Sequence, residues 1–231
     1  MMKIFSRYFE ETLELGSNHF YHLVIERPKT YRKFLLELMD QINDDGECLI
    51  LKNGEKEIDL AKAAILIKNP VFWEIDEKKV STVVQKDIVA NLGEERIAEY
   101  NNLLADINRW IDSICLDYSL PISYEAELPV SSFLKAFSVS SSSTSEDFLE
   151  QFIADIIRMS SVFKKNVFFA VNAHDVFDEN EIETIFQELK MNEINILFVS
   201  AHKPNAYSAS EKMILIDSDL AELHLHRSDS E

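Results

Sequence analysis

Two continuous apolar runs in the last third of the chain predict a pair of buried strands. Residues 167–171 and 194–199 are rich in β-branched and aromatic side chains and are bounded by polar positions, which is typical of strands covered on both faces. Between them, Asp178 and Glu181 have the spacing of a capping box at a helix start. The apolar positions of that helix are Ile182, Ile185, Phe186 and Leu189. This stretch therefore predicts two parallel strands joined by a right-handed crossover helix, with 167–171 as a central strand.

The rest of the chain predicts further strands and the helices that cover them. Residues 1–25 indicate a hairpin-like pair that leads into a core strand at 20–25, with a turn at 16–18. A helix follows Pro28, and we expect Thr30 to be its N-cap. Further turns are expected at 44–46 and at Asn53-Gly54, the latter a strong hairpin signal. The remaining elements are strands at 48–52, 64–67 and 213–216, a short strand near 139, and a buried helix over 148–163 whose first turn holds residues 146–147.

The pattern is helical from 72 to 118. Gly93 separates two amphipathic helices, and the second has apolar residues at alternating intervals of three and four. These apolar positions are Ile97, Tyr100, Leu104, Ile107, Ile111, Ile114 and Tyr118. The spacing predicts a protruding helical hairpin whose narrow apolar seam suits an antiparallel partner or another subunit. A short helix near 131–137 then leads back to the sheet.

Composition restricts the class of protein. The chain has 231 residues, 46% of them hydrophobic, with only four glycines and five prolines, which indicates a folded protein with either one large core or one core plus an appendage. Its 41 acidic and 23 basic residues give a formal charge of −18, which by itself repels nucleic acid and anionic membranes.

Cys48 and Cys115 lie in apolar settings typical of buried thiols. With no signal segment and no apolar run of membrane length, we expect a soluble cytoplasmic protein.

Sequence patterns for catalysis and for metal binding are incomplete. The turn at 26–30 ends in Lys29-Thr30, like a Walker loop, but contains no glycine to expose backbone N–H groups to a phosphate. Asn172 stands where an ATPase would have a magnesium-binding aspartate, so we interpret Asn172, His174 and Asp175 as turn residues. The pairs His19/His22 and His224/His226 lack a third and fourth metal ligand in sequence. We therefore expect a protein that is not an enzyme.

Three segments carry a resemblance to a known family. They are Leu134-Lys135-Ala136-Phe137, the helix start 145–150, and Lys164-Lys165-Asn166 leading into VFFAVNA, with NILFVS after the crossover helix. In their order and spacing, over roughly residues 20–217, the chain resembles the CRISPR-associated adaptation protein that is the signature of subtype II-A, the Csn-two family. The resemblance implies an α/β, parallel-sheet head (1–70 and 135–231) like a degenerate P-loop or RecA-like domain, without an active nucleotide site. An α-helical leg (71–134) would be inserted into this head.

The same resemblance implies a function. Members of that family form ring-shaped homotetramers, bind calcium, and hold linear double-stranded DNA in the central channel through lysines. They act in spacer acquisition beside the CRISPR integrase complex and the RNA-guided nuclease. A ring can turn its few cations inward and its carboxylates outward, which reconciles an acidic chain with DNA. Candidate inward cations are Lys78, Lys79, Lys86, Lys135, Arg158, Lys164 and Lys165.

The calcium site implied by the resemblance is only partly represented. The return segment of the leg contains just three carboxylates, Asp117, Glu125 and Glu127, whereas calcium takes six to eight oxygen ligands. We therefore do not expect the usual calcium site in full. Two other functions are left open by the residues themselves: a nucleotide-dependent enzyme on the same fold, and an acidic protein-interaction module in which DNA has no role.

Overall fold

The computed structural model describes residues 2–16, 18–43, 46–142 and 145–225. The chain divides into two compact units, which are treated separately below. Residues 1–74 and 143–231 form the first, here called the sheet unit, and residues 75–142 form the second, the helical unit. The expected turns at 16–18 and 44–46, His226 and the acidic tail lie partly or wholly outside the described residues. Within the described ranges, no helix has both the length and the apolar character needed to cross a bilayer.

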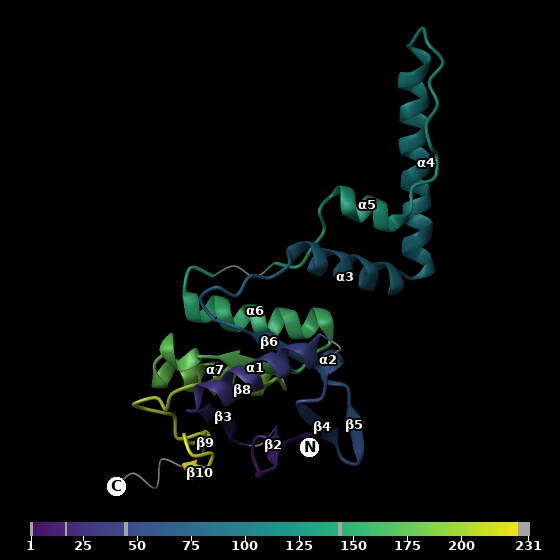
Figure 1. Ribbon diagram of the computed structural model, residues 1–231. Coiled ribbons are helices and arrows are strands. Elements are labelled where there is room, and N and C mark those ends of the chain that lie inside the picture. Colours follow the sequence, from purple (N-terminus) through teal and green to yellow (C-terminus); the bar gives the residue numbers. More distant parts are fainter. Residues whose placement is uncertain (1, 17, 44–45, 143–144, 226–231) are drawn as a thin grey trace. The chain divides into compact units, whose positions relative to one another are not determined.

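A six-stranded sheet forms the centre of the sheet unit (Figure 1). Its strands in spatial order are β10 (Glu222–Leu225), β9 (Glu211–Ile216), β3 (Phe20–Ile25), β8 (Asn195–Ser200), β7 (Val167–Val171) and β6 (Ala64–Ile67). All neighbours are parallel except β10, which is antiparallel to β9. The predicted α/β class and the parallel pairing of β7 with β8 are confirmed. β7 is interior but not central, because β3 and β8 occupy the middle, and burial alone does not distinguish one interior strand from another.

A second, antiparallel sheet of four strands packs in the same unit. Its spatial order is β2 (Leu13–Leu15), β1 (Met2–Ser6), β4 (Leu49–Asn53) and β5 (Lys56–Ile58). The predicted N-terminal pair is β1 with β2, and the Asn53-Gly54 turn joins β4 to β5. Gly54 has a φ of 63°, a conformation that glycine adopts without steric cost. The hairpin signals were therefore correct, but they build a separate sheet from the one that contains β3.

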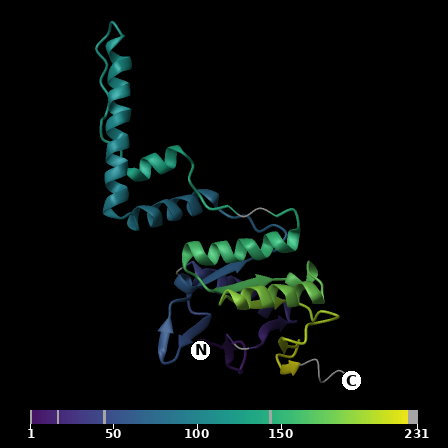
Figure 2. The ribbon, with the colours of Figure 1, turned by 180° about the vertical axis from the view of Figure 1, so that it is seen from behind.

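Helices cover both faces of the six-stranded sheet. Alternate residues of β3 point to opposite faces: Tyr21 and Leu23 belong to one core with Phe34 of α1 (Pro28–Ile42), whereas Phe20 belongs to a second core. That second core contains α6 (Phe148–Phe163) and α7 (Glu179–Met191). Accordingly α1 lies in front of the sheet in Figure 1 and α7 in front in Figure 2. A four-residue helix, α2 (Leu60–Ala63), precedes β6.

Three expected local details are wrong. α1 begins at Pro28 with Arg27 as N-cap, so Thr30 is not the cap. Proline is favoured in the first helical turn because its φ is already helical and its missing N–H is not needed there. No strand forms near Val139 among the described residues 138–142. Asp147 precedes α6 as its N-cap and accepts a hydrogen bond from the Glu150 amide at 2.9 Å, so residues 146–147 are not in the first turn.

The capping box at the start of α7 is confirmed. The Asp178 side chain accepts hydrogen bonds from the amides of Asn180 (2.8 Å) and Glu181 (3.0 Å). The Glu181 carboxylate in turn accepts the Asp178 amide at 2.8 Å. These bonds satisfy three backbone donors that a helix start leaves unpaired. The four predicted apolar positions of α7 are all buried.

Replacing Asp178 by alanine is therefore expected to lower the free energy of unfolding by about 1 kcal/mol, the usual cost of losing an N-cap side chain. Urea unfolding of the two proteins measures the difference. Asp178→Asn keeps a capping oxygen and should retain most of the stability. Equal losses in both variants would show that the carboxylate charge, and not the cap geometry, stabilises this helix start.

The helical unit contains α3 (Glu77–Ala90), α4 (Glu94–Leu116) and α5 (Val130–Ala136). Gly93 separates α3 from α4 as predicted and is the N-cap of α4. α3 and α4 do not form the expected antiparallel hairpin: α3 packs with α5, and α4 runs at an angle to α3 (Figure 1). The segment that returns along α4 is extended. Its backbone carbonyls at Ala126 and Leu128 accept hydrogen bonds from Asn108 and Tyr100, so the α4 seam contacts an extended chain instead of a helix.

Candidate nucleic-acid interface

A groove of about 810 Å³ lies between α3 and α5 in the helical unit. Three lysines line it: Lys78 and Lys86 from α3 and Lys135 from α5. All three are exposed to solvent. The other lining residues are Glu77, Ser81, Thr82, Gln85, Ser131, Ser132 and Ser138. This feature, here called the lysine groove, contains three of the seven cations expected to contact DNA.

Local sequence explains why α3 presents lysines to this groove. Asp76 caps the helix by accepting hydrogen bonds from the amides of Lys78 and Lys79, each at 3.1 Å. A helix that starts there places positions 78, 82 and 86 on one face, because residues four apart are neighbours along a helix. Val80, which lies off this stripe, is fully buried. The apolar side of α3 is thus turned inward and the lysine stripe outward.

The end of α5 forms the other wall of the groove. Ser138 adopts a left-handed conformation with a φ of 52°, which reverses the chain after the helix. The Val139 amide then donates to the Leu134 carbonyl at 3.0 Å. The Gln85 side-chain amide donates to the Val139 carbonyl at 2.9 Å and ties this turn to α3. The two walls are therefore held together by a specific hydrogen bond and not by apolar packing alone.

The chemistry of the lysine groove suits a phosphate backbone. Lysine ammonium groups and hydroxyl side chains are the usual partners of phosphate oxygens in protein–DNA contacts. Glu77 is the one carboxylate in the lining. The basic residues of the helical unit are Lys78, Lys79, Lys86, Arg96, Arg109 and Lys135, and both arginines pair with a carboxylate on α4. Positive charge in this unit is thus concentrated on α3 and α5.

The remaining candidate cations lie elsewhere. Lys79 is on α3 but does not line the groove. Lys164 is exposed and ends α6 in a left-handed conformation. Arg158 is nearly buried, with 8% of its side chain exposed, and lies 4.0 Å from the Asp155 carboxylate. The Lys165 ammonium donates to the backbone carbonyls of Ala61 (2.5 Å) and Ala64 (3.0 Å). The side chains of Arg158 and Lys165 therefore both make contacts inside the sheet unit.

Lys165 is consequently expected to matter for stability. Lys165→Met should lower the free energy of unfolding by about 1–3 kcal/mol, because hydrogen bonds from a charged donor are lost and two partly buried carbonyls lose a partner. Chemical unfolding followed by circular dichroism measures this. The neighbouring, exposed Lys164→Met is the matched control and should change stability by less than about 0.5 kcal/mol. A larger loss in the Lys164 variant would contradict this assignment.

The three candidate calcium ligands do not gather in space. Asp117 follows the end of α4, and Glu125 and Glu127 are exposed on the extended return segment. In the part of the chain that the structure describes, a compact group of at least three potential metal ligands occurs elsewhere, at His22, His174 and Glu211. The carboxylates of the helical unit therefore offer separate charges and no assembled cage. Calcium binding stays a prediction.

A side-chain contact joins the end of β7 to the first turn of α1. Asn172 ends β7 in a left-handed conformation with a φ of 55°. The Tyr31 hydroxyl, from the first turns of α1, donates to the Asn172 side-chain oxygen at 3.0 Å. Burial raises the pKa of Tyr31, so its hydroxyl is a neutral donor at physiological pH. Asn172, which stands where an ATPase would have a magnesium-binding aspartate, is therefore already bonded to α1.

The contacts of the histidines with carboxylates are visible only in the structure. His224 lies in β10 and pairs on the surface with Glu11 and Glu222. His22 and His174, which the sequence analysis treated separately, stack on each other and both contact Glu211. Glu211 was missed entirely. Its signal was a lone carboxylate two residues before the apolar run 213–216, at the start of β9.

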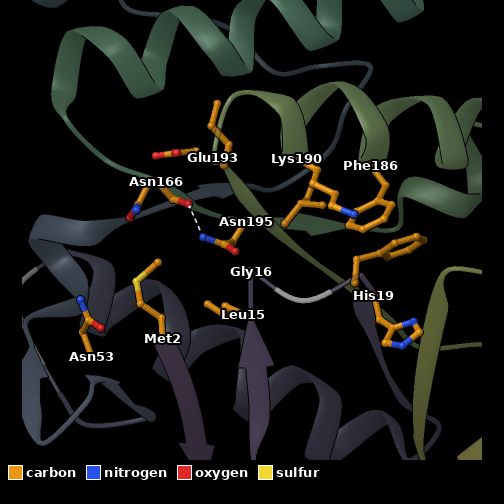
Figure 3. A pocket seen from close by; sticks show the side chains of 13 residues that line it. Met2, Leu15, Gly16, His19, Asn53, Asn166, Phe186, Lys190, Glu193 and Asn195 are labelled. Atoms are coloured by element: carbon orange, nitrogen blue, oxygen red, sulfur yellow. Dashed lines mark hydrogen bonds between the residues drawn. The ribbon is translucent and has the colours of Figure 1, made fainter.

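A second cavity, of about 420 Å³, lies at the amino ends of β3, β7 and β8 (Figure 3). Its Lys190 ammonium donates to the Asn18 side chain at 2.8 Å, and the Asn195 amide bonds to the Asn166 carbonyl, as the dashed line in Figure 3 marks. Open α/β sheets bind their ligands at the opposite, carboxyl end of the strands. This cavity is therefore a weaker candidate than the lysine groove.

Most of the chain matches the model of a known protein family. Residues 41–220 match the family model described as CRISPR-associated protein (Cas_Csn2). The match covers more than three quarters of the chain. It contains the whole helical unit, including both walls of the lysine groove, together with β6, β7, β8 and β9 of the sheet.

Proposed function

The chain belongs to the family of CRISPR-associated Cas_Csn2 proteins, and from this premise we propose that it binds double-stranded DNA, without catalysing a reaction, during the acquisition of new spacers. The observation that carries the proposal is the lysine groove, where Lys78, Lys86 and Lys135 meet among hydroxyl side chains. A protein with a formal charge of −18 repels DNA unless its cations are gathered locally. The groove is such a gathering.

We propose further that several copies assemble so that their lysine grooves face a common channel. α4 supports an assembly because none of its residues is buried in the chain by itself. Leu103, Trp110 and Ile114 are 46%, 65% and 38% exposed along it. An apolar surface of this kind is usually covered by a partner, and a second copy of the chain offers the same surface. The proposed assembly is the ring-shaped homotetramer that the family resemblance implies.

We also propose calcium as a bound ion, and the CRISPR integrase complex and the RNA-guided nuclease as partners. The support for these three is the family resemblance alone. A divalent cation would offset part of the repulsion between the carboxylates of neighbouring copies, including Asp117, Glu125 and Glu127. Chelation is therefore expected to weaken the assembly before it weakens the fold of each copy.

The test of the proposal compares DNA forms. Purified protein should run as a tetramer in size-exclusion chromatography with light scattering. It should retard linear duplex DNA more strongly than covalently closed circular duplex, because a closed ring must be threaded by a free end. The affinity should fall steeply between 50 and 200 mM salt, as it does for any interface that releases counterions. A monomer that ignores both DNA forms at every salt concentration would leave the protein-interaction module as the better function.

The nucleotide-dependent enzyme is the second alternative, and the contact between Tyr31 and Asn172 argues against it. We expect that ATP with magnesium leaves the melting temperature unchanged, since a ligand that does not bind the folded state cannot stabilise it. Differential scanning fluorimetry with millimolar nucleotide provides the measurement. A nucleotide-dependent rise in the melting temperature would favour the enzyme instead.

A further inference from the structure

Two histidines and one glutamate form a buried cluster in the sheet unit. His22 lies in β3, Glu211 begins β9, and His174 lies in the short 3-10 helix η1 (Ala173–Asp175) that follows β7. The side chains of His22 and Glu211 are 0% exposed and that of His174 is 7% exposed. Buried ionisable groups are costly unless they are paired or bind a metal. This cluster is separate from the lysine groove, and nothing in the proposed DNA binding requires it.

A chain of hydrogen bonds fixes the orientation of His22. The Ser200 hydroxyl donates to the His202 carbonyl at 2.8 Å, so its oxygen accepts the Nε2 proton of His22 at 2.7 Å. With the proton on Nε2, the neutral ring presents the lone pair of Nδ1 to the Glu211 carboxylate, whose Oε1 lies 2.7 Å away. Two acceptors at this distance repel each other unless a cation lies between them. That cation is either a proton, held by His22 or by Glu211, or a metal ion.

The three side chains are close enough to share one ion. Each offers one potential ligand atom, and these atoms all lie within 4.8 Å of one another. A metal ion suits this set, because it binds neutral imidazole and anionic carboxylate.

His174 provides the independent observation. Its ring stacks on His22 with centroids 4.3 Å apart and planes 7° from parallel, and its Nε2 lies 3.1 Å from a Glu211 oxygen. Its Nδ1 is buried and has no hydrogen-bond partner among the described residues. Leaving a buried polar atom unpaired costs free energy, so packing alone does not explain why this ring is held here. Convergence of both rings on one ion requires His174 to tilt out of the parallel stack.

We propose that His22, His174 and Glu211 bind a divalent transition metal of the zinc class. Two imidazoles and one carboxylate are a common three-ligand set for zinc, with water in the fourth position. Calcium and magnesium are excluded as the preferred ions because they take oxygen ligands almost entirely. Ser200 holds His22 in the tautomer that coordinates through Nδ1, as hydrogen-bond partners of metal-binding histidines generally do. The ion would crosslink β3, β9 and the turn after β7.

The experiment uses the full chain, freed of metal by a chelator and then dialysed. Titration with Zn²⁺ should give one tight site per chain and a higher melting temperature. Co²⁺ should give the visible absorption of a four-coordinate nitrogen and oxygen site, whereas Ca²⁺ should not compete. His174→Ala should weaken Zn²⁺ binding at least about 10-fold, and Ser200→Ala by about 10–100-fold, the range for partners of ligands. His174 is chosen because it lies in a short turn and not in a strand, and circular dichroism checks that the variant folds.

His224→Ala is the matched control. His224 is an exposed histidine beside the carboxylates of Glu11 and Glu222, so it reports surface binding that the cluster does not cause. Retention of the tight site in His224→Ala, with its loss in His174→Ala, supports the proposal. Absence of tight Zn²⁺ binding in the unsubstituted protein overturns it and leaves a purely hydrogen-bonded cluster. Equal affinity in the unsubstituted and His174→Ala proteins overturns it as well.

Discussion

Replacing Lys78, Lys86 and Lys135 together by glutamine is expected to weaken binding of linear duplex DNA on the order of 100-fold at 0.1 M salt. Each lysine that neutralises a phosphate releases about 0.9 of a counterion, so the three lysines of each copy that contacts the duplex contribute about 2.7 logarithmic units per tenfold change in salt. Glutamine keeps a side chain of similar polarity, and all three positions are exposed, so the fold should be unaffected. Fluorescence anisotropy with a short labelled duplex measures the dissociation constant.

The control must reproduce the change in net charge. Lys29, Lys33 and Lys56 are exposed lysines of the sheet unit, and their joint replacement by glutamine alters the total charge equally. This control should change DNA affinity by only a few fold. If both triple variants lost affinity to the same degree, the overall charge and not the lysine groove would determine binding, and the groove would not be the interface.

The salt dependence separates a lost contact from an unfolded protein. A variant that has lost these phosphate contacts should show a slope of log affinity against log salt that is shallower by about 2.7 for each copy that contacts the duplex. Partial unfolding instead lowers the active fraction and leaves the slope unchanged. The two causes of weaker binding are therefore distinguishable in the same titration.

The largest loss of stability is expected for Phe168→Ala. Phe168 lies in β7, is fully buried and belongs to the core that contains α6 and α7. Removing a buried aromatic ring costs about 3–5 kcal/mol, because the transfer free energy is lost and a cavity remains. Since domains are typically stable by about 5–15 kcal/mol, this variant loses a large part of its stability. The midpoint of urea unfolding measures the effect.

Two further substitutions make the stability prediction decisive. Phe168→Leu retains much of the buried volume and should lie between the alanine variant and the unsubstituted protein. Phe72→Ala is the exposed control, since Phe72 is 80% exposed, and it should change the free energy of unfolding by less than about 0.5 kcal/mol. A Phe168→Ala protein as stable as the Phe72→Ala protein would contradict the placement of β7 in the core.

The local elements of the sheet unit could be predicted because their signals lie within a few residues. Asp178 and Glu181 are three residues apart, and the turn Asn53-Gly54 is contiguous. Capping and turn formation depend on bonds of this short range. The start of α1 was predicted wrongly, because both Pro28 and Thr30 are residues typical of a helix start. The helix begins at Pro28, two residues before Thr30.

The lysine groove was only half predictable. Lys78 and Lys86 lie on one helical face by periodicity, together with Thr82, and this stripe could have been identified from sequence. Lys135 joins them only because α5 packs on α3, an arrangement that the expected hairpin of α3 and α4 did not include. The amphipathic pattern of a helix shows that it has an apolar side, but not which segment covers that side.

The sequence by itself determined the α/β class, most of the strand and helix segments, and the family resemblance, because hydrophobic periodicity and turn chemistry act between neighbours in the chain. Only the tertiary structure decided the strand order, the closure of Asn172 by Tyr31, the backbone contacts of Lys165, and the meeting of His22, His174 and Glu211. The members of these contacts are separated by tens of residues or more. Such contacts form when the whole core condenses, and no short-range pattern specifies them.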